Sequence, residues 1–257
     1  MIYVALRTRT LVAAGGAVLV SVALTGCGSD PSDAPAEHKA FALSGKTLTI
    51  RTDDSAVELV PADVKSVEVT RHVDGWVFMG SGPHASWSME NDTLSLKVKC
   101  SAVISSCAAR HQIKVPRGVA VVLKDDNGSV TATGFDTPLK LRSDNGKVTV
   151  RDSSGALDLN SDNGTIDADG ISSRQITADS SNGEVRLSLT AAPDRVETDS
   201  NNGSIEIALP QKPGLAYKVR TRTNNGSTKV GVPTDDASRH TVTAHSDNGR
   251  ITVRSAN

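Results

Sequence analysis

Aromatic residues are scarce in this sequence of 257 residues, because three Phe, two Trp and two Tyr make up only 3% of it. An enzyme of this size usually lines its core and its pocket with more rings. Neither sign of charge dominates, since 28 Lys and Arg stand against 29 Asp and Glu. The basic surface that nucleic-acid binding requires is therefore missing. We do not expect nucleic acid to be a partner.

The apolar run near the N-terminus is shorter than the roughly 20 residues that a bilayer span needs. It covers residues 11–24, follows Arg7 and Arg9, and ends in Leu-Thr-Gly-Cys. This is the layout of a secretory signal peptide, and its last four residues resemble a bacterial lipobox. We expect residues 1–26 to be removed and Cys27 to carry the lipid that anchors the protein to a membrane. An ordinary signal with an incidental cysteine is the alternative.

Cysteine is also scarce, with three residues in the chain. Once Cys27 is assigned to the lipid, Cys100 and Cys107 remain in an exported protein, and exported proteins meet an oxidising compartment. The pair predicts a disulfide that closes a short loop. A metal site or a redox pair is the alternative, although the spacing is typical of neither.

The C-terminal half contains an internal repeat, which is a sign of a solenoid or array. The dipeptide Asn-Gly occurs seven times, and its glycines are 18, 18, 19, 20, 23 and 23 residues apart. The copies are Asn127-Gly128, Asn145-Gly146, Asn163-Gly164, Asn182-Gly183, Asn202-Gly203, Asn225-Gly226 and Asn248-Gly249. Asn and Gly both tolerate the positive φ of tight turns, and a preceding Ser or Asp can accept hydrogen bonds from turn amides. Each copy therefore predicts a sharp corner.

A β-strand is expected to begin two residues after each of these glycines. The residues there are Val130, Val148, Ile166, Val185, Ile205, Thr228 and Ile251. A second run in each unit shows the same period of two, as in Leu139 and Leu141. The near-constant period favours an all-β fold, a β-solenoid of about seven short coils. A twisted antiparallel meander is the alternative. The two longest spacings predict extra loop residues at 211–214 and 233–238.

The region before the repeats predicts irregular β structure. The expected strands cover residues 47–51, 57–60, 66–71, 86–90, 93–99, 111–115 and 119–123. Residues 74–87 are the least strand-like part and contain Trp76, Phe78 and Trp87. These rings either plug the open end of the stack or form an exposed patch for a partner.

These observations divide the chain into four parts. Residues 1–26 are the signal peptide, 27–40 a flexible tether, 41–123 an N-terminal β region or cap, and 124–257 the Asn-Gly repeat region.

The lipobox, the irregular β region and repeats of the form Ser-Asp-Asn-Gly-x-Val/Ile together resemble a bacterial family of putative adhesins. Its members are β-strand-repeat domains of unknown function, common in exported lipoproteins. The resemblance covers about residues 41–257 and is carried by the repeats. It implies a β-helix-like fold at the cell surface and no catalytic residues.

Acidic residues recur at the corners, and they are the strongest candidates for chemistry. They are Asp126, Asp144, Asp162 and Asp247. Pairs of carboxylates from neighbouring coils would suit glycoside hydrolysis, and a ladder of carboxylates would suit calcium. Turn formation explains the same residues more simply. No metal or cofactor site is expected elsewhere, because the histidines lack a metal-ligand spacing.

The predicted function is that of a non-catalytic lipoprotein on the extracytoplasmic face of a bacterial membrane. It would present its β-repeat surface for adhesion or protein interaction to an unidentified envelope protein or glycan. An envelope carbohydrate-active enzyme and a calcium-binding surface protein are the alternatives.

Overall fold

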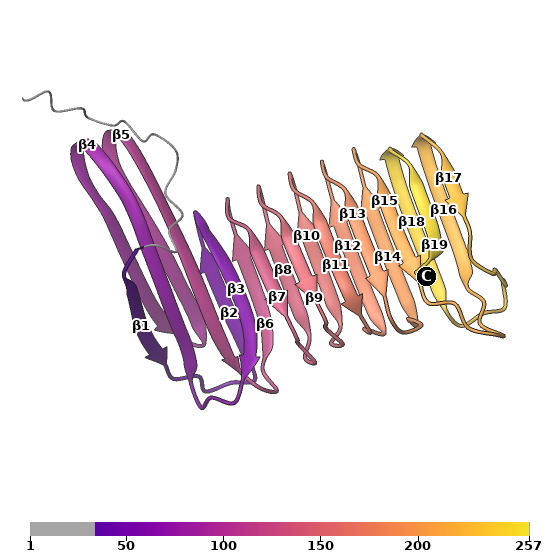
Figure 1. Cartoon of the computed structure of the whole chain (residues 1–257), viewed down its shortest axis with the longest axis horizontal. Helices are drawn as coiled ribbons and strands as arrows, with labels where there is room; N and C mark the ends of the chain where they lie inside the picture. The colour runs from indigo at the N-terminus through magenta and orange to yellow at the C-terminus, as the bar shows by residue number, and fades with distance from the viewer. Residues whose placement is uncertain (1–33, 257) are drawn as a thin grey trace, which may run out of the picture.

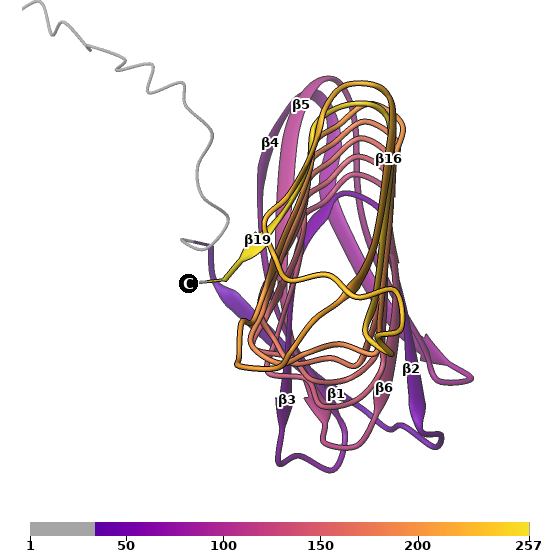
Figure 2. The same ribbon diagram turned by 90° about the vertical axis from the view of Figure 1, so that its right-hand side faces the viewer.

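The computed structural model describes residues 34–256, and for residues 76–80 and 100–106 it describes the backbone alone. Nineteen strands join in one sheet, which winds into an elongated stack of flattened coils (Figure 1). Viewed along the stack, the coils superimpose on a narrow loop with two long sides (Figure 2). Among residues 34–256, no helix is both long and apolar enough to cross a bilayer.

Each coil in the middle of the stack contributes one strand to each long side. In order along the chain, the strands are β6 (Ala120–Asp125) and β7 (Val130–Thr133), β8 (Leu139–Ser143) and β9 (Val148–Arg151), β10 (Leu157–Ser161) and β11 (Ile166–Ile171), β12 (Gln175–Ser180) and β13 (Val185–Leu189), and β14 (Arg195–Ser200) and β15 (Ile205–Leu209). Neighbouring coils pair in parallel, with Leu141 opposite Leu159 on one side and Val150 opposite Ala168 on the other. The solenoid is confirmed, and the antiparallel meander is wrong for the repeats.

All seven strands that follow an Asn-Gly corner begin at the predicted residue. Alternate side chains point into the space between the two long sides, so that Leu141, Leu159 and Ala178 form one buried column. The interior is thin and filled mainly by aliphatic side chains. This explains the low aromatic content, because a narrow coil has little room for rings.

The C-terminal coils do not stack in the order of the sequence. They are formed by β16 (Lys218–Asn225) with β17 (Thr228–Val230) and by β18 (Thr241–Asn248) with β19 (Ile251–Ser255). β18 pairs with β14 on one side and with β16 on the other. The last coil of the chain therefore lies between β14/β15 and β16/β17 (Figure 1). The expected loops at 211–214 and 233–238 lie in the connections from β15 to β16 and from β17 to β18, which allow this change in the order of the coils.

At the N-terminal end, too, the strands do not stack in the order of the sequence, because a hairpin of β4 and β5 lies outside the first coil. β2 (Thr47–Thr52) and β3 (Ser55–Ala62) form a coil that pairs with β6 and β7. On its other side lies β5 (Thr93–Pro116), whose first part pairs with β2 and whose last part pairs with β3. β5 thus bends around the narrow end of the coil. β4 (Val67–Glu90) runs antiparallel beside it, and β1 (Ala36–Phe41) adds to β4.

Several N-terminal predictions need correction. Residues 66–71 and 86–90 belong to one strand, β4, which also includes the segment 74–87 that looked least strand-like. Its glycines and Pro83 lie where the strand bends, and the pairing with β5 shifts register between Ser81 and His84. Residues 93–99 and 111–115 likewise belong to one strand, β5.

Two expected boundaries also move. The end of the proposed tether is ordered as β1, which begins at Ala36. The expected boundary between residues 123 and 124 falls inside β6. The cap and the repeats share one sheet and one hydrophobic core.

Candidate interaction surfaces

The seven corner glycines are required by close packing between coils. None of them has the positive φ that the sequence reasoning assumed, since the glycines that do are Gly82, Gly118, Gly134, Gly170 and Gly214. Instead, a Cβ on Gly164 would lie 2.1 Å from the carbonyl oxygen of Gly146, one coil back. The same close approach, at 1.8–2.1 Å, recurs at the other six corners. Any side chain there would force neighbouring coils apart.

A serine or threonine opens six of the seven corner motifs and links its coil to the preceding coil of the stack. Ser143 Oγ donates to the carbonyl oxygen of Gly128 at 3.0 Å, and Ser161 Oγ donates to that of Gly146 at 3.0 Å. The equivalent bonds are made by Ser180, Ser200, Ser246 and Thr223. The expectation that these side chains accept hydrogen bonds from turn amides is therefore wrong for the serines, which donate between coils.

The corner asparagines form a ladder of side-chain amides along the edge of the stack. Asn145 Nδ2 donates to Asn127 Oδ1 at 2.8 Å, and Asn163 Nδ2 donates to Asn145 Oδ1 at 2.9 Å. The ladder continues in the same direction through Asn182, Asn202, Asn248 and Asn225. At its other end, Asn127 Nδ2 donates to Asp54 Oδ1 at 2.7 Å. The positive ends of the aligned amide dipoles thus face a carboxylate.

Asp125 replaces the serine at the first Asn-Gly corner and is the most unusual residue of the series. It is fully buried, and one oxygen accepts a hydrogen bond from the amide of Gly128. Its Oδ1 has no hydrogen-bond partner among the described residues. Burial, opposed in part by the Gly128 amide, raises the pKa of Asp125 to about 7.

The corner aspartates that were weighed as catalytic or calcium ligands each lie beside a side chain that can pair with them. Asp144 and Asp162 both bind Arg142, at 3.0 and 2.9 Å. Asp126 lies 3.9 Å from Lys124, and Asp247 accepts a hydrogen bond from Asn224 at 2.6 Å. Within the described part of the chain, no group of three or more His, Cys, Asp or Glu side chains is placed to hold a metal ion.

The predicted covalent sites lie at the limits of what the structure describes. Cys27 and the signal peptide are outside the described residues. Cys100 and Cys107 both fall in the stretch of β5 between its pairing with β2 and its pairing with β3. The side chain of Cys100 is not described, so the disulfide stays a prediction.

Of the three rings in the expected patch, Trp87 is the one whose side chain is described; those of Trp76 and Phe78 lie outside the described part. The Trp87 ring is half-buried against the core and meets Phe41 edge-on, with ring centroids 6.1 Å apart. The guanidinium of Arg71 lies 4.0 Å from the Trp87 ring centroid. Trp87 therefore packs inside the N-terminal end of the stack.

An ion pair lies next to these rings at the N-terminal end of the stack. Arg71 is buried and binds Glu37 of β1 at 2.7 Å. It lies opposite His111 in the β4–β5 ladder. Burial, with a further contribution from the charge of Arg71, lowers the pKa of His111 to about 4. The imidazole is therefore neutral at physiological pH.

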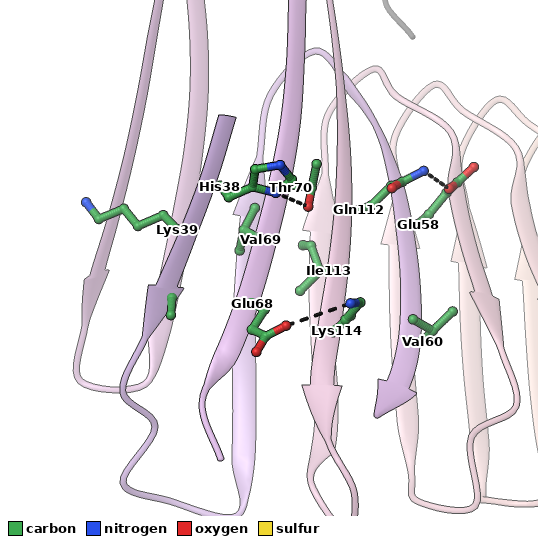
Figure 3. Close-up of a pocket in the computed structure, with 11 residues that line it drawn as sticks. His38, Lys39, Glu58, Val60, Glu68, Val69, Thr70, Gln112, Ile113 and Lys114 are labelled. Atoms are coloured by element: carbon green, nitrogen blue, oxygen red, sulfur yellow. Dashed lines mark hydrogen bonds and ion pairs between the residues drawn. The ribbon is translucent and has the colours of Figure 1, made fainter. Parts of the chain in front are cut away.

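A groove of about 510 Å³ crosses the outer face of β1, β4, β5 and β3 (Figure 3). Two rows of side chains line it, and neighbouring members of a row pair with one another. His38 Nδ1 lies 2.9 Å from Thr70 Oγ1, and Gln112 Nε2 donates to Glu58 Oε2 at 3.2 Å. The second row contains Glu68 and Lys114, 3.8 Å apart, and ends at an exposed valine, Val60. The sequence did not predict this groove, because it indicated no pairing between these strands and β1 lies mostly within the expected tether.

The groove is lined by polar side chains together with apolar ones such as Val60. Its two carboxylates are held by basic partners, because Glu58 binds Arg110 and Glu68 binds Lys114. The groups with the largest pKa shifts, at His111, Asp125 and Tyr217, lie on three different coils inside the stack.

Comparison with known proteins agrees with this architecture. Residues 47–256 match the family described as Toastrack DUF4097. The chain belongs to this family. The match covers the Toastrack domain from β2 to β19 and so joins the N-terminal region and the repeats in one unit. The family is a domain of unknown function, and no curated protein sequence matches the chain.

Several solved structures resemble the Toastrack domain at low sequence identity. A putative cell adhesion protein from Clostridium sporogenes is 11% identical, with a TM-score of 0.34, over 86% of this chain and 99% of that one. A putative adhesin from Bacteroides fragilis is 13% identical, with a TM-score of 0.42, over 89% and 100% of the two chains. A putative adhesin from Parabacteroides merdae is 12% identical, with a TM-score of 0.39, over 86% and 97%.

Proposed function

We propose that this Toastrack protein is a non-catalytic, lipid-anchored protein of the bacterial envelope that binds another envelope molecule. The observation that carries the proposal is the groove of Figure 3, whose polar and apolar side chains lie in ordered rows and whose carboxylates are already paired. A rigid in-register stack supports this role, because it holds the lining side chains in fixed rows before a ligand arrives. The ligand class that fits is an extended glycan or peptide.

The proposed anchor would set where the groove works. Residues 28–35 separate Cys27 from β1, and an extended chain spans at most about 3.5 Å per residue. The first strand of the groove would therefore lie within about 30 Å of the lipid headgroups. A partner at or near the same membrane would reach it most easily.

The anchor is tested by replacing Cys27 with Ser in the full chain and following the protein through membrane fractionation. The wild type should be found in the membrane fraction and carry acyl chains by mass spectrometry. A Cys27→Ser chain that stays membrane-bound would contradict lipid anchoring.

The groove is tested by cross-linking in cells, followed by identification of the bound protein or glycan. Val60→Arg and Thr70→Arg should each reduce the captured partner at least tenfold, because a long cation fills the groove. Thr177→Arg, a similar change on the remote strand β12, is the control. Equal capture by all variants would rule out the groove. Turnover of an envelope glycan by the purified protein, abolished at the corner aspartates, would replace binding with catalysis.

A further inference from the structure

The coil formed by β16 and β17 ends the stack with an open edge. β16 pairs with β18 on one side. On its other side, the described residues provide only a single bridge, between Tyr217 and Thr234 at the start of the strand. In the described part of the chain, β17 pairs with β19 alone. Figure 1 shows both strands at the outer limit of the stack, opposite the end that carries β1.

The backbone of β16 presents hydrogen-bonding groups along this edge. The amide of Lys218 donates inward to His240 O at 2.8 Å, while that of Tyr217 donates outward to Pro233 O at 3.0 Å. Successive residues of a parallel strand alternate in this way. The amides and carbonyls of Val219 and Thr221 therefore face the open side. Such an edge is a template for an added strand.

The two ends of the stack differ in how they are closed. At the N-terminal end, an antiparallel hairpin and the Phe41–Trp87 ring pair cover the interior. At the C-terminal end, Val230 is 41% exposed and Val219 is only partly buried. An added strand with aliphatic side chains beside β16 would cover Val219.

The positive charge of the end coil favours the binding of an acidic strand. Residues 218–230 contain Lys218, Arg220, Arg222 and Lys229 and no acidic residue. Elsewhere, several outward charges on adjacent coils pair with each other, as in Arg254 with Glu206 at 2.6 Å. The end coil presents three cations at alternate positions of β16, next to an edge where residues 34–256 supply no further strand.

We propose that the outer edge of β16 binds an extended acidic polypeptide segment, which adds to the sheet as a further strand. Its acidic residues, at every second position, pair with Arg220 and Arg222, and the aliphatic residues between them cover Val219. A second copy of the same coil is disfavoured, because two rows of cations would face each other. The site extends the proposed interaction role and is separate from the groove.

The probe is a fluorescent peptide that alternates four Val with three Glu between Gly-Ser ends, titrated into the full-length protein. Fluorescence anisotropy should show saturable binding. A peptide with Lys in place of Glu should not bind. A peptide that keeps the Glu residues but has Pro at two of the Val positions should bind at least tenfold more weakly, because it cannot complete the ladder.

Protein variants locate the site. The double variant R220E/R222E should lose at least tenfold in affinity for the acidic peptide. The double variant R51E/K124E makes the same charge change on β2 and β6, far from β16, and should keep the wild-type affinity. Thr221→Pro removes an amide that faces the open side, so it should weaken binding while the unfolding midpoint stays close to wild type. Val60→Arg in the groove should leave peptide affinity unchanged, which separates this proposal from the proposed function.

Three results would overturn the proposal. The first is no binding of the acidic peptide. The second is that the proline peptide binds as tightly as the acidic peptide, or that Thr221→Pro binds the acidic peptide as tightly as wild type does. Either result would show attraction between charges without strand addition. The third is self-association of the protein that R220E/R222E abolishes, which would make a second copy the occupant of the edge.

Discussion

Gly164 lies directly against Gly146 of the preceding coil, so closely that a Cβ on Gly164 would be 2.1 Å from the Gly146 carbonyl oxygen. Real Cβ atoms do not approach an oxygen this closely. The corner glycines are therefore spacers that set the distance between coils. Conformational freedom is not their role, because none of the seven has a positive φ.

Gly164→Ala should destabilise the protein about as strongly as Gly164→Val, by roughly 2–4 kcal/mol, because the first carbon of the side chain already clashes. Urea unfolding followed by circular dichroism measures this. Gly214→Ala is the control: Gly214 has φ +76° and open space around it, so the change should cost only about 1 kcal/mol. An unchanged midpoint for Gly164→Ala would contradict the packing described at the corners.

Asn163→Ala should break the amide ladder in the middle of the stack. Asn163 donates to Asn145 and accepts from Asn182, each at 2.9 Å. These bonds are exposed to solvent, so the expected loss is modest, about 1 kcal/mol in the free energy of unfolding. Asn201→Ala, at a corner position outside the ladder, should change the midpoint much less. Equal effects of the two substitutions would show that the ladder adds no stability.

Asp125 should make stability depend on pH. Its pKa is raised from 3.8 to about 7 in the folded protein, so the folded state binds the proton more tightly than the unfolded state. The destabilising effect is complete above pH 7 and disappears as the pH falls from 7 to 4. Asp125→Ser, which restores the residue of the other corners, should therefore gain more stability over wild type at pH 8 than at pH 5.

The expected difference between the two pH values is about 2–4 kcal/mol. Chemical denaturation at both pH values measures it, with Asp126→Ser as the control, since that carboxyl lies on the surface beside Lys124. The same gain at both pH values would mean that Asp125 is ionised in the folded protein at pH 5.

Trp87→Ala should open the N-terminal end of the stack. The substitution removes the ring that packs against Phe41 and Arg71, and the expected cost is about 2–4 kcal/mol for a partly buried Trp. Val60→Ala, at an exposed position, is the control. If Trp87→Ala unfolds like wild type but loses partner binding, Trp87 acts as part of an interaction patch instead.

Much of the repeat region could be predicted from the sequence, because its pattern is local. The dipeptide Asn-Gly and the aliphatic residue two positions later set each corner and the start of each strand, as at Gly164 and Ile166. The alternation of buried and exposed residues follows from the period of two in a strand. The same pattern does not reveal why glycine is needed, because the carbonyl that excludes a Cβ belongs to another coil.

The ends of the stack could not be predicted from local patterns. The glycines and Pro83 in residues 74–87 are typical of a loop, yet these residues continue β4 around a bend. The insertion of β18 between β14 and β16 depends on which edges are free, and no residue in β18 signals it. The groove has the same origin, because pairing between distant segments brings His38, Gln112 and Glu58 together.

The order of the C-terminal coils places the basic coil at the open end of the stack. Glu197 lies opposite Thr243, and Thr243 lies opposite Arg220, so Glu197 and Arg220 are two strands apart. Neighbouring parallel strands are about 4.8 Å apart, which permits a disulfide, whereas two strand spacings do not.

The most direct test is oxidation of two double-cysteine variants of the full chain, read by peptide mapping under non-reducing conditions. We predict a cross-link in Glu197→Cys/Thr243→Cys and none in Glu197→Cys/Arg220→Cys. The reverse result would place the coils in the order of the sequence, with β16 beside β14, and would contradict the account.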